Sequence, residues 1–438
     1  MTSEDLPSNW SLMPLAQVLR DLPNGRLVEQ GWSPQCHGQP ALEVGAWGVL
    51  KTTSIQPGEF RSEHNKLLPG DLTPKPSLEV LPGDLLLTAA GPQTRCAIPC
   101  LVRATRPRLM ISGKIYRFRA EESVMDPRFL ELFLLSPMAQ KSLNAMKTGI
   151  SDSGLNLTQS RFLGLEVVVP QLKEQRHIVE MLEDHLYRLE VAQASVRTAR
   201  TRLKALRESW LAEHLGDPPS HEVHRLGDSL LEARGGWSRS RKHLVAASDG
   251  VPYLKMNNIS RSGTLIVGEV VHVQADEKDL GRYGIRPGDI LFNSKNSGDL
   301  IGKTAVATET IGGWTFNENI MRLRFDERLE PAFVGLWFMA PRMRRQILRA
   351  ASASTNVAAV YKHHLIEMSI WIPALARQQR LVDQSGVLAE GSAHLDRELG
   401  AADVRSANLR RALLAAAFSG RLTGRVSDME MVEELVGV

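Results

Sequence analysis

The sequence contains little that would favour membrane insertion, disulfide formation or metal binding. No apolar run approaches the roughly 18–20 residues that a membrane-spanning helix needs, and the acidic residues near the N-terminus do not fit a signal peptide. The 3 cysteines contain no CxxC pair, so they predict neither a disulfide framework nor a zinc site. We therefore expect a cytoplasmic protein with free thiols and no metal ligands.

Motifs of common enzyme chemistry are also missing. GDLIGKT at 298–304 has one residue too few between its glycines for a phosphate-binding P-loop, so it predicts a turn between strands. DPPS at 217–220 has no following aromatic residue and no accompanying glycine-rich SAM loop, so we interpret it as a helix stop and linker. The adjacent His363 and His364 have no HExxH frame. We expect no catalytic residue in this chain.

The chain also has no large excess of positive over negative charge. The net charge is +4 over 438 residues, and residues 1–172 and 221–372 each have only a small basic surplus. This balance permits nucleic acid as a partner without demonstrating it. The length is too great for one core and favours two to four domains.

An internal repeat with a period near 204 residues organises the chain. Three pairs of segments keep the same order and nearly the same offset: VLKTTSI (49–55) with YLKMNNI (253–259), LPGDLLL (81–87) with RPGDILF (286–292), and PQLKEQRHIV (170–179) with PALARQQRLV (373–382). One such pair could arise by chance, but three in order indicate a duplicated unit.

Each unit has the same succession of elements. LPGD and RPGD predict turns that lead into buried strands at 85–88 and 290–293. Shorter helical stretches are expected at 126–146 and 331–350, before a long helix in each unit. The mixed segments are therefore predicted to be α+β.

The two long helices carry a narrow apolar seam. Residues 173–215 include no Pro or Gly, and small or apolar residues recur there in alternating steps of three and four. We assign the seam to Leu182, Leu189, Val196, Leu203, Leu206, Trp210, Leu388, Leu395, Leu399, Leu409 and Leu413. Pairing of the two helices would bury both seams.

Polar and basic residues at predicted strand ends are the candidate DNA-binding groups. Asn and Arg can bond to base edges, and Lys can meet phosphate. The candidates are Lys51, Arg106, Arg108, Lys114, Lys255, Asn257, Asn258, Asn293, Lys295, Asn296 and Lys303.

This organisation resembles the specificity subunit of type I restriction–modification enzymes over roughly residues 8–424. The most specific segments are VVVPQLKEQRHIVEMLE, IWIPALARQQRLV and RRALLAAAFSGRLTG. One departure is Arg377-Gln378-Gln379 at the second helix start, where the first has Lys173-Glu174-Gln175. The resemblance implies two pseudo-repeated target recognition domains that read a bipartite, asymmetric double-stranded DNA site. It also implies that the helices pair as an antiparallel coiled coil, and that this subunit is non-catalytic.

The resemblance further implies partners and domain limits. Two modification (methyltransferase) subunits would bind SAM, and separate restriction subunits would use ATP and magnesium, so this chain needs no cofactor of its own. The expected ranges are recognition domains at 1–170 and 217–372, spacer helices at 171–216 and 373–424, and an acidic tail at 425–438. The recognition module of a related DNA methylation or phage-defence system stays open as an alternative. A coiled-coil scaffold, or an enzyme proper, fits the motifs less well.

Overall fold

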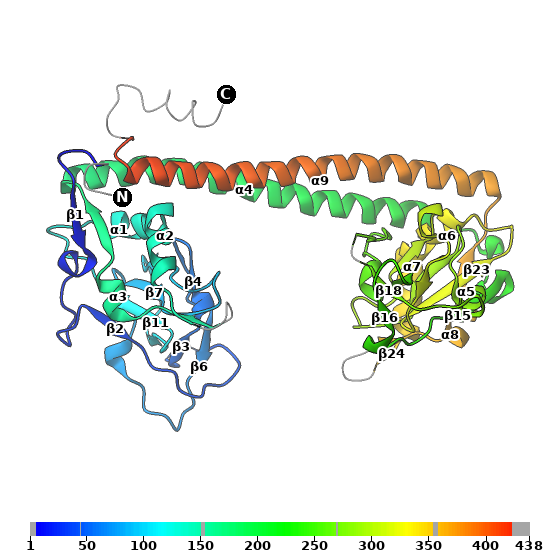
Figure 1. Cartoon of the computed structure of the whole chain (residues 1–438), viewed down its shortest axis with the longest axis horizontal. Helices are drawn as coiled ribbons and strands as arrows, with labels where there is room; N and C mark the ends of the chain where they lie inside the picture. The colour runs from blue at the N-terminus through cyan, green and yellow to red at the C-terminus, as the bar shows by residue number, and fades with distance from the viewer. Residues whose placement is uncertain (1–5, 44, 150–153, 269, 354–357, 423–438) are drawn as a thin grey trace. The chain divides into compact units, whose positions relative to one another are not determined.

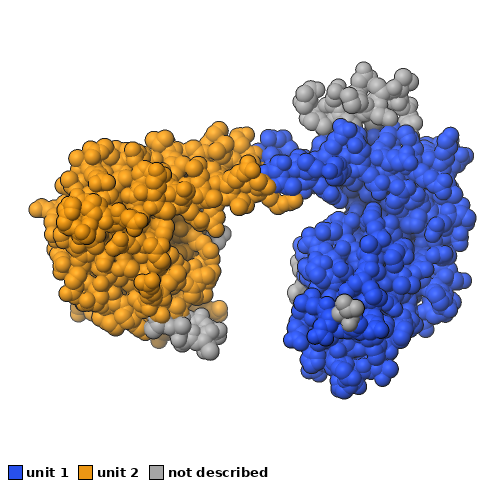
Figure 2. Space-filling model, turned by 180° about the vertical axis from the view of Figure 1, so that it is seen from behind, with its two compact units in different colours: residues 1–196, 401–438 blue, residues 197–400 orange. Residues whose placement is uncertain are grey.

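The computed structural model describes residues 6–43, 45–149, 154–268, 270–353 and 358–422, so the predicted acidic tail lies outside the described residues. The chain forms two compact units, residues 1–196 with 401–438 and residues 197–400, which Figure 2 shows in separate colours. Both units mix strands with helices, which confirms the predicted α+β class. Because the unit limits fall inside the long helices, each unit contains one mixed domain and part of both helices.

The first mixed domain is built around two main sheets, which are accompanied by two-stranded sheets. The larger has the antiparallel order β2 (Val28–Gln30), β11 (Ile115–Phe118), β7 (Leu85–Thr88) and β9 (Pro99–Leu101). The smaller has the order β10 (Leu109–Met110), β3 (Gly48–Leu50) and β6 (Asn65–Leu67), with β10 parallel to β3. Leu85 and Leu87 pack into one core while Leu86 packs into another, so β7 is apolar on both faces.

The turn before β7 explains the LPGD motif. Gly83 has φ +88°, a left-handed conformation that glycine adopts without strain. The fully buried Asp84 accepts a hydrogen bond from the backbone N–H of Leu81 at 2.8 Å and another from Arg119 Nε at 2.6 Å. The motif therefore closes the turn and fixes an ionic contact inside the domain.

The second mixed domain repeats this topology. One four-stranded sheet has the order β15 (Leu230–Gly235), β23 (Ile320–Phe325), β19 (Ile290–Asn293) and β21 (Thr304–Val306). A second four-stranded sheet has the order β16 (Leu244–Val245), β18 (Val271–Val273), β17 (Val251–Leu254) and β22 (Thr315–Phe316), again with one parallel pair. Gly288 has φ +83°, and Asp289 accepts from the Arg286 N–H and from Arg324, as in the first turn. The duplication inferred from sequence is thus confirmed in the fold.

The helical stretch predicted at 126–146 is two helices, α1 (Pro127–Leu135) and α2 (Pro137–Met146), and the one at 331–350 is likewise divided into α6 (Pro331–Met339) and α7 (Pro341–Ala350). Both predicted helical stretches are therefore confirmed, and each is interrupted once. Ser136 and Ala340 each precede a proline, whose ring disfavours the helical conformation of the preceding residue. Both residues accordingly have extended backbone angles.

The two long helices, α4 (Leu172–Leu215) and α9 (Leu375–Phe418), run antiparallel in each unit (Figure 1). In the first unit Glu190 lies 3.8 Å from Arg410, and Gln193 Nε2 bonds Ser406 Oγ at 3.1 Å. In the second unit Arg200 lies 3.4 Å from Asp396. Contact positions rise along α4 as they fall along α9, which confirms the predicted antiparallel pairing.

Burial along the predicted seam is uneven. Leu182 and Leu413 are fully buried, while the intervening seam residues Leu189, Val196, Leu203, Trp210, Leu388, Leu399 and Leu409 are half-buried. Leu206 and Leu395, in contrast, are 53% and 52% exposed, so assigning them to a buried seam was wrong.

A buried glutamine attaches the start of each long helix to its domain. Gln175 accepts a hydrogen bond from the Asp126 N–H at 2.8 Å and donates to the Val124 and Pro170 carbonyls. Gln378 accepts from the Glu330 N–H at 2.8 Å and donates to the Arg328 and Pro373 carbonyls. Gln378 is therefore the structural counterpart of Gln175, as the alignment of 170–179 with 373–382 predicted, whereas the comparison of Lys173-Glu174-Gln175 with Arg377-Gln378-Gln379 was shifted by one residue.

Candidate nucleic-acid interface

Loops and a short 3-10 helix gather at one edge of the second domain's sheet formed by β15, β23, β19 and β21. β15 and β19 end there, at Gly235 and Asn293, and the antiparallel β21 and β23 begin there. The helix η8 (Met256–Asn258) joins this edge because Asn293 Nδ2 bonds the Met256 carbonyl at 3.1 Å. We call segments 236–243, 255–258, 294–303 and 317–319 the polar edge of the second domain.

All seven DNA-binding candidates of the second unit lie at this edge or at the strand end beneath it. Four of them hold the edge together instead of facing outward. Asn258 is 4% exposed and bonds the Lys255 N–H and the Ile266 carbonyl. Asn293 is fully buried, and Asn296 bonds the Ser297 N–H. This revises the prediction for Asn258, Asn293 and Asn296, because side chains buried in the domain cannot reach a base edge in this conformation.

Lys303 is the fourth of these structural residues. Its ammonium group donates to the Met256 carbonyl at 2.9 Å and to the Ile259 carbonyl at 2.5 Å, and so clamps both sides of η8. Burial lowers the pKa of Lys303 below its ordinary value, and the nearby charge of Arg261 adds to this effect. A half-buried ammonium bonded to two carbonyls supports the loop, which revises the expectation that Lys303 meets phosphate.

Lys255, Asn257 and Lys295 keep polar groups available at the same edge. Asn257 is exposed at the middle of η8, and Lys255 and Lys295 are half-buried. No side-chain hydrogen bond or ion pair joins Asn257 or Lys295 to any other residue within the described ranges. These three remain the candidates through which the second domain could contact DNA.

Sequence reasoning missed a basic turn that follows β15. Arg241 and Lys242 are exposed on the 3-10 helix η7 (Arg241–His243). The turn starts at Gly236, where a Cβ atom would lie 2.3 Å from the Phe316 and Asn317 carbonyl oxygens, so glycine is required for this close approach. The signal was available: Gly-Trp-Ser occurs at 236–238 and, one repeat earlier, at 31–33.

The side chain of Trp237 packs against residues of the domain and so anchors this turn. Its ring stacks on Tyr283 with centroids 4.9 Å apart, and the Arg239 guanidinium lies 3.6 Å from the ring centre. Arg239 also pairs with Asp279 at 3.1 Å, and Tyr253 Oη bonds the Trp237 carbonyl at 2.6 Å. The exposed cations of η7 are thus presented by a turn with a packed aromatic base.

The first domain has an equivalent edge, formed by segments 31–41, 51–54, 89–98 and 112–114. Lys114 is exposed there, and Lys51 is half-buried at the start of η3 (Thr52–Ser54). Arg95 fixes η3 by donating to the Thr52 carbonyl at 2.6 Å and to the Ile55 carbonyl at 3.0 Å. Lys51 and Lys114 therefore lie on the first domain's edge, which is equivalent to the polar edge of the second domain.

Arg106 and Arg108 do not join Lys51 and Lys114. They lie between the end of β9 and the start of β10, at the opposite end of the strands. The Arg106 guanidinium donates to the Ala41 carbonyl at 2.8 Å and to the Ala46 carbonyl at 3.2 Å. Arg108 bonds the Gly45 carbonyl with its side chain and Glu79 with its backbone. These bonds hold the guanidinium groups of Arg106 and Arg108 against the backbone of their own domain, so in this conformation Lys51 and Lys114 are the more available candidates.

Other basic residues of the strands form buried ion pairs within their own domain. Arg322 is 1% exposed and bonds Glu232, and Arg324 bonds both Glu232 and Asp289. Burial acts to raise the pKa of Glu232, but hydrogen bonds from Arg234 and Arg322 and the charges of Arg322 and Arg324 outweigh it, so the pKa is lowered. Arg117, Arg119, Glu29 and Asp84 form the matching cluster in the first domain. Basic composition alone therefore overstates the charge available to a ligand.

Within the described ranges, no group of three or more His, Cys, Asp or Glu side chains could hold a metal ion. The described helices also include none that is long and apolar enough to cross a membrane. All three cysteines are free, and burial raises the pKa of each thiol, most strongly at Cys100.

Comparisons with known proteins agree on one family. No protein-family model matches the chain. The Type I restriction enzyme EcoEI specificity subunit of Escherichia coli is 34% identical over 180 residues, which are 41% of this chain and 29% of that relative. The Type I restriction enzyme EcoKI specificity subunit of Escherichia coli (strain K12) is 19% identical over 97% of this chain and 92% of its own length.

A solved structure extends the likeness to the fold. A chain from a study of complex assembly and conformational transition of the type I R-M system matches with a TM-score of 0.70, 21% identity, and coverage of 95% of this chain and 99% of its own. This match concerns the fold, which includes the duplicated domains and the two long helices. The sequence relatives confirm the resemblance drawn from the repeated motifs: over 97% of its length the chain is similar to specificity subunits of type I restriction enzymes.

Proposed function

We propose that this chain is the DNA sequence-recognition subunit of a type I restriction–modification complex in the cytoplasm. Each mixed domain reads one half of a bipartite double-stranded DNA site through its polar edge. The observation that carries this proposal is the duplication of one fold whose edges bear different side chains: Lys51 and Lys114 in one domain, and Lys255, Asn257, Lys295 and the η7 cations in the other. Because the edges differ, the two half-sites differ, and the target is asymmetric.

The same proposal assigns the chemistry to partner subunits. Two modification subunits dock on this chain, bind SAM and methylate DNA, while restriction subunits use ATP and magnesium. This chain positions them on the DNA and is itself non-catalytic. The missing SAM loop and the missing catalytic motifs support this division. The isolated chain is expected not to methylate DNA, and methylation is expected once modification subunits are added.

The test is a domain exchange read out by methylome sequencing. Residues 221–372 are replaced with the corresponding segment of a relative, and the glutamine-bonded helix start is kept. The expected result is a new sequence in one half-site and an unchanged sequence in the other. Alanine at Asn257 should weaken recognition on the second-domain side, by about 1–3 kcal/mol if the amide contacts a base. If both half-sites changed together in the exchange, independent reading would be refuted.

A further inference from the structure

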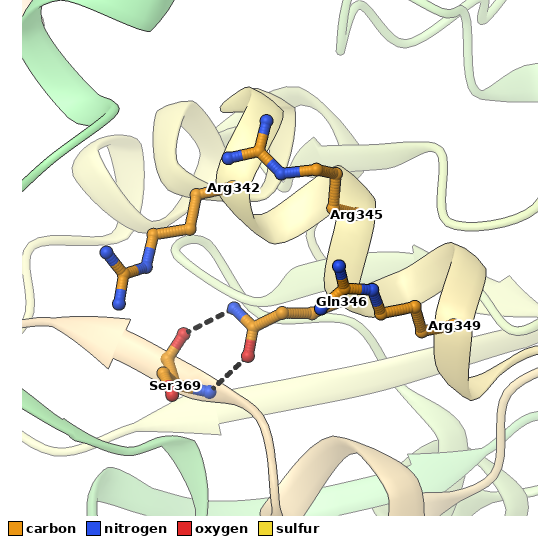
Figure 3. A pocket seen from close by; sticks show the side chains of 5 residues that line it. All are labelled: Arg342, Arg345, Gln346, Arg349 and Ser369. Carbon is orange, nitrogen blue, oxygen red and sulfur yellow. Dashed lines mark hydrogen bonds between the residues drawn. The ribbon is translucent and has the colours of Figure 1, made fainter.

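The helix α7 of the second domain carries a basic face outside the polar edge. Arg342, Arg345 and Arg349 line a hollow of about 270 Å³ together with Gln346 and Ser369. Figure 3 shows these arginines on α7, with Gln346 bonded to the backbone of Ser369 on β26 (Ser369–Trp371). Three cations thus surround one opening whose lining includes no acidic residue.

These three arginines have no structural task within the described ranges. No hydrogen bond or ion pair joins their guanidinium groups to another described residue, and α7 itself has no acidic side chain. Arg344 provides the contrast, since it donates to the Ile301 and Asp299 carbonyls and so secures the loop beside it. Met343 and Ile347 supply the buried face of the helix.

The helix is adjacent to the polar edge of the second domain. Arg344 bonds residues of segment 294–303, and a Cβ atom at Gly302 would lie 2.7 Å from an Ile347 methyl group. The helix α7 therefore borders the polar edge through Arg344 and Ile347, and the three arginines of the hollow lie on another side of the same helix. Positions 342 to 349 span about 10.5 Å along a helix at 1.5 Å per residue, which corresponds to about three steps of one DNA strand at 3.4 Å each.

We propose that the arginine face of α7, formed by Arg342, Arg345 and Arg349, binds the phosphate backbone of DNA beside the half-site read by the second domain. This inference rests on the proposed function and adds phosphate contacts that do not depend on the DNA sequence. The first domain has no equivalent, because the corresponding positions of α2 are Met138, Lys141 and Ala145. This set of three phosphate contacts is therefore expected of the second domain and not of the first.

The experiment measures DNA affinity against salt concentration for the full chain assembled with its modification subunits. The variant R342Q/R345Q/R349Q removes the charges, and R342K/R345K/R349K is the matched control that retains them. Each phosphate contact contributes about 0.9 to the slope of log K against log salt. If all three contacts form, a fourfold rise in salt should weaken the glutamine variant about 40-fold less than the wild type. The lysine control should keep the wild-type slope, and sequence preference should be unchanged in both variants.

Two outcomes would overturn the proposal. A glutamine variant with the wild-type salt slope would show that the face does not meet phosphate. If that variant instead lost modification subunits during purification while its salt slope was unchanged, the face would bind an acidic protein surface. Failure of the proposed function would look different, because the wild-type complex would then show no preference between target and non-target duplexes.

Discussion

Replacement of Gln378 by leucine tests whether one buried side chain attaches the long helix to the second domain. The amide is fully buried and makes three hydrogen bonds to backbone groups: it accepts from the Glu330 N–H and donates to the Arg328 and Pro373 carbonyls. Leucine has a similar size but offers no polar atom. The Glu330 N–H and two carbonyls would then lose their partner in a site that water does not reach.

The expected loss of stability follows from the three backbone groups that would lose their hydrogen-bond partner. A buried polar group left unsatisfied costs about 1–3 kcal/mol, and carbonyls tolerate it better than N–H groups. We therefore expect Q378L to lower the free energy of unfolding of the second unit by about 2–5 kcal/mol. The neighbouring Gln379 is exposed and bonds only Asp383 on its own helix, so Q379L should change stability by less than about 0.5 kcal/mol.

Urea denaturation followed by far-UV circular dichroism and tryptophan fluorescence supplies the measurement. Gln175 makes the same three contacts in the first unit, so Q175L provides an independent repetition. Each variant should lower the midpoint of the transition that belongs to its own unit. The reasoning is refuted if Q378L unfolds at the same urea concentration as Q379L.

Three further results are expected. N258A should destabilise the second unit by about 1–3 kcal/mol because Asn258 is buried and bonded on both sides, whereas N257A should leave the urea midpoint unchanged; equal destabilisation by both would contradict the distinction. G391A should stabilise the second unit by about 1 kcal/mol, since a Cβ atom there meets no atom within 4 Å and glycine weakens a helix interior; a lower midpoint would show that the glycine is needed. Folding lowers the pKa of Glu232, so its ionised form stabilises the protein at pH values above 4.5, the ordinary pKa of a glutamate, and this stabilisation is lost as the pH falls through the folded-state pKa. The difference in unfolding free energy between wild type and E232Q should therefore narrow between about pH 7 and about pH 3. A difference that stays constant with pH would refute this link between Glu232 ionisation and stability.

The sequence by itself determined the duplication, the fold class and the pairing of the two long helices, whose antiparallel direction was implied by the resemblance to type I specificity subunits. LPGD and RPGD mark equivalent turns because a left-handed glycine and a buried aspartate are both needed to close them. The heptad-like spacing of α4 and α9 predicted their pairing, since such a seam is buried only against a second helix. These are local signals, and local chemistry suffices to read them.

The tertiary structure alone decided which polar side chains are available to DNA. Asn257 and Asn258 are neighbours of the same type, yet one is exposed and the other is bonded inside the domain. The ammonium of Lys303 is bonded to two backbone carbonyls, and Arg106 lies at the far end of the strands from Lys51. The arginines of α7 stand out only once Arg344 is seen to be bonded to the adjoining loop. Availability depends on partners that are distant in sequence, because burial and hydrogen bonding are satisfied by whichever groups the fold brings together.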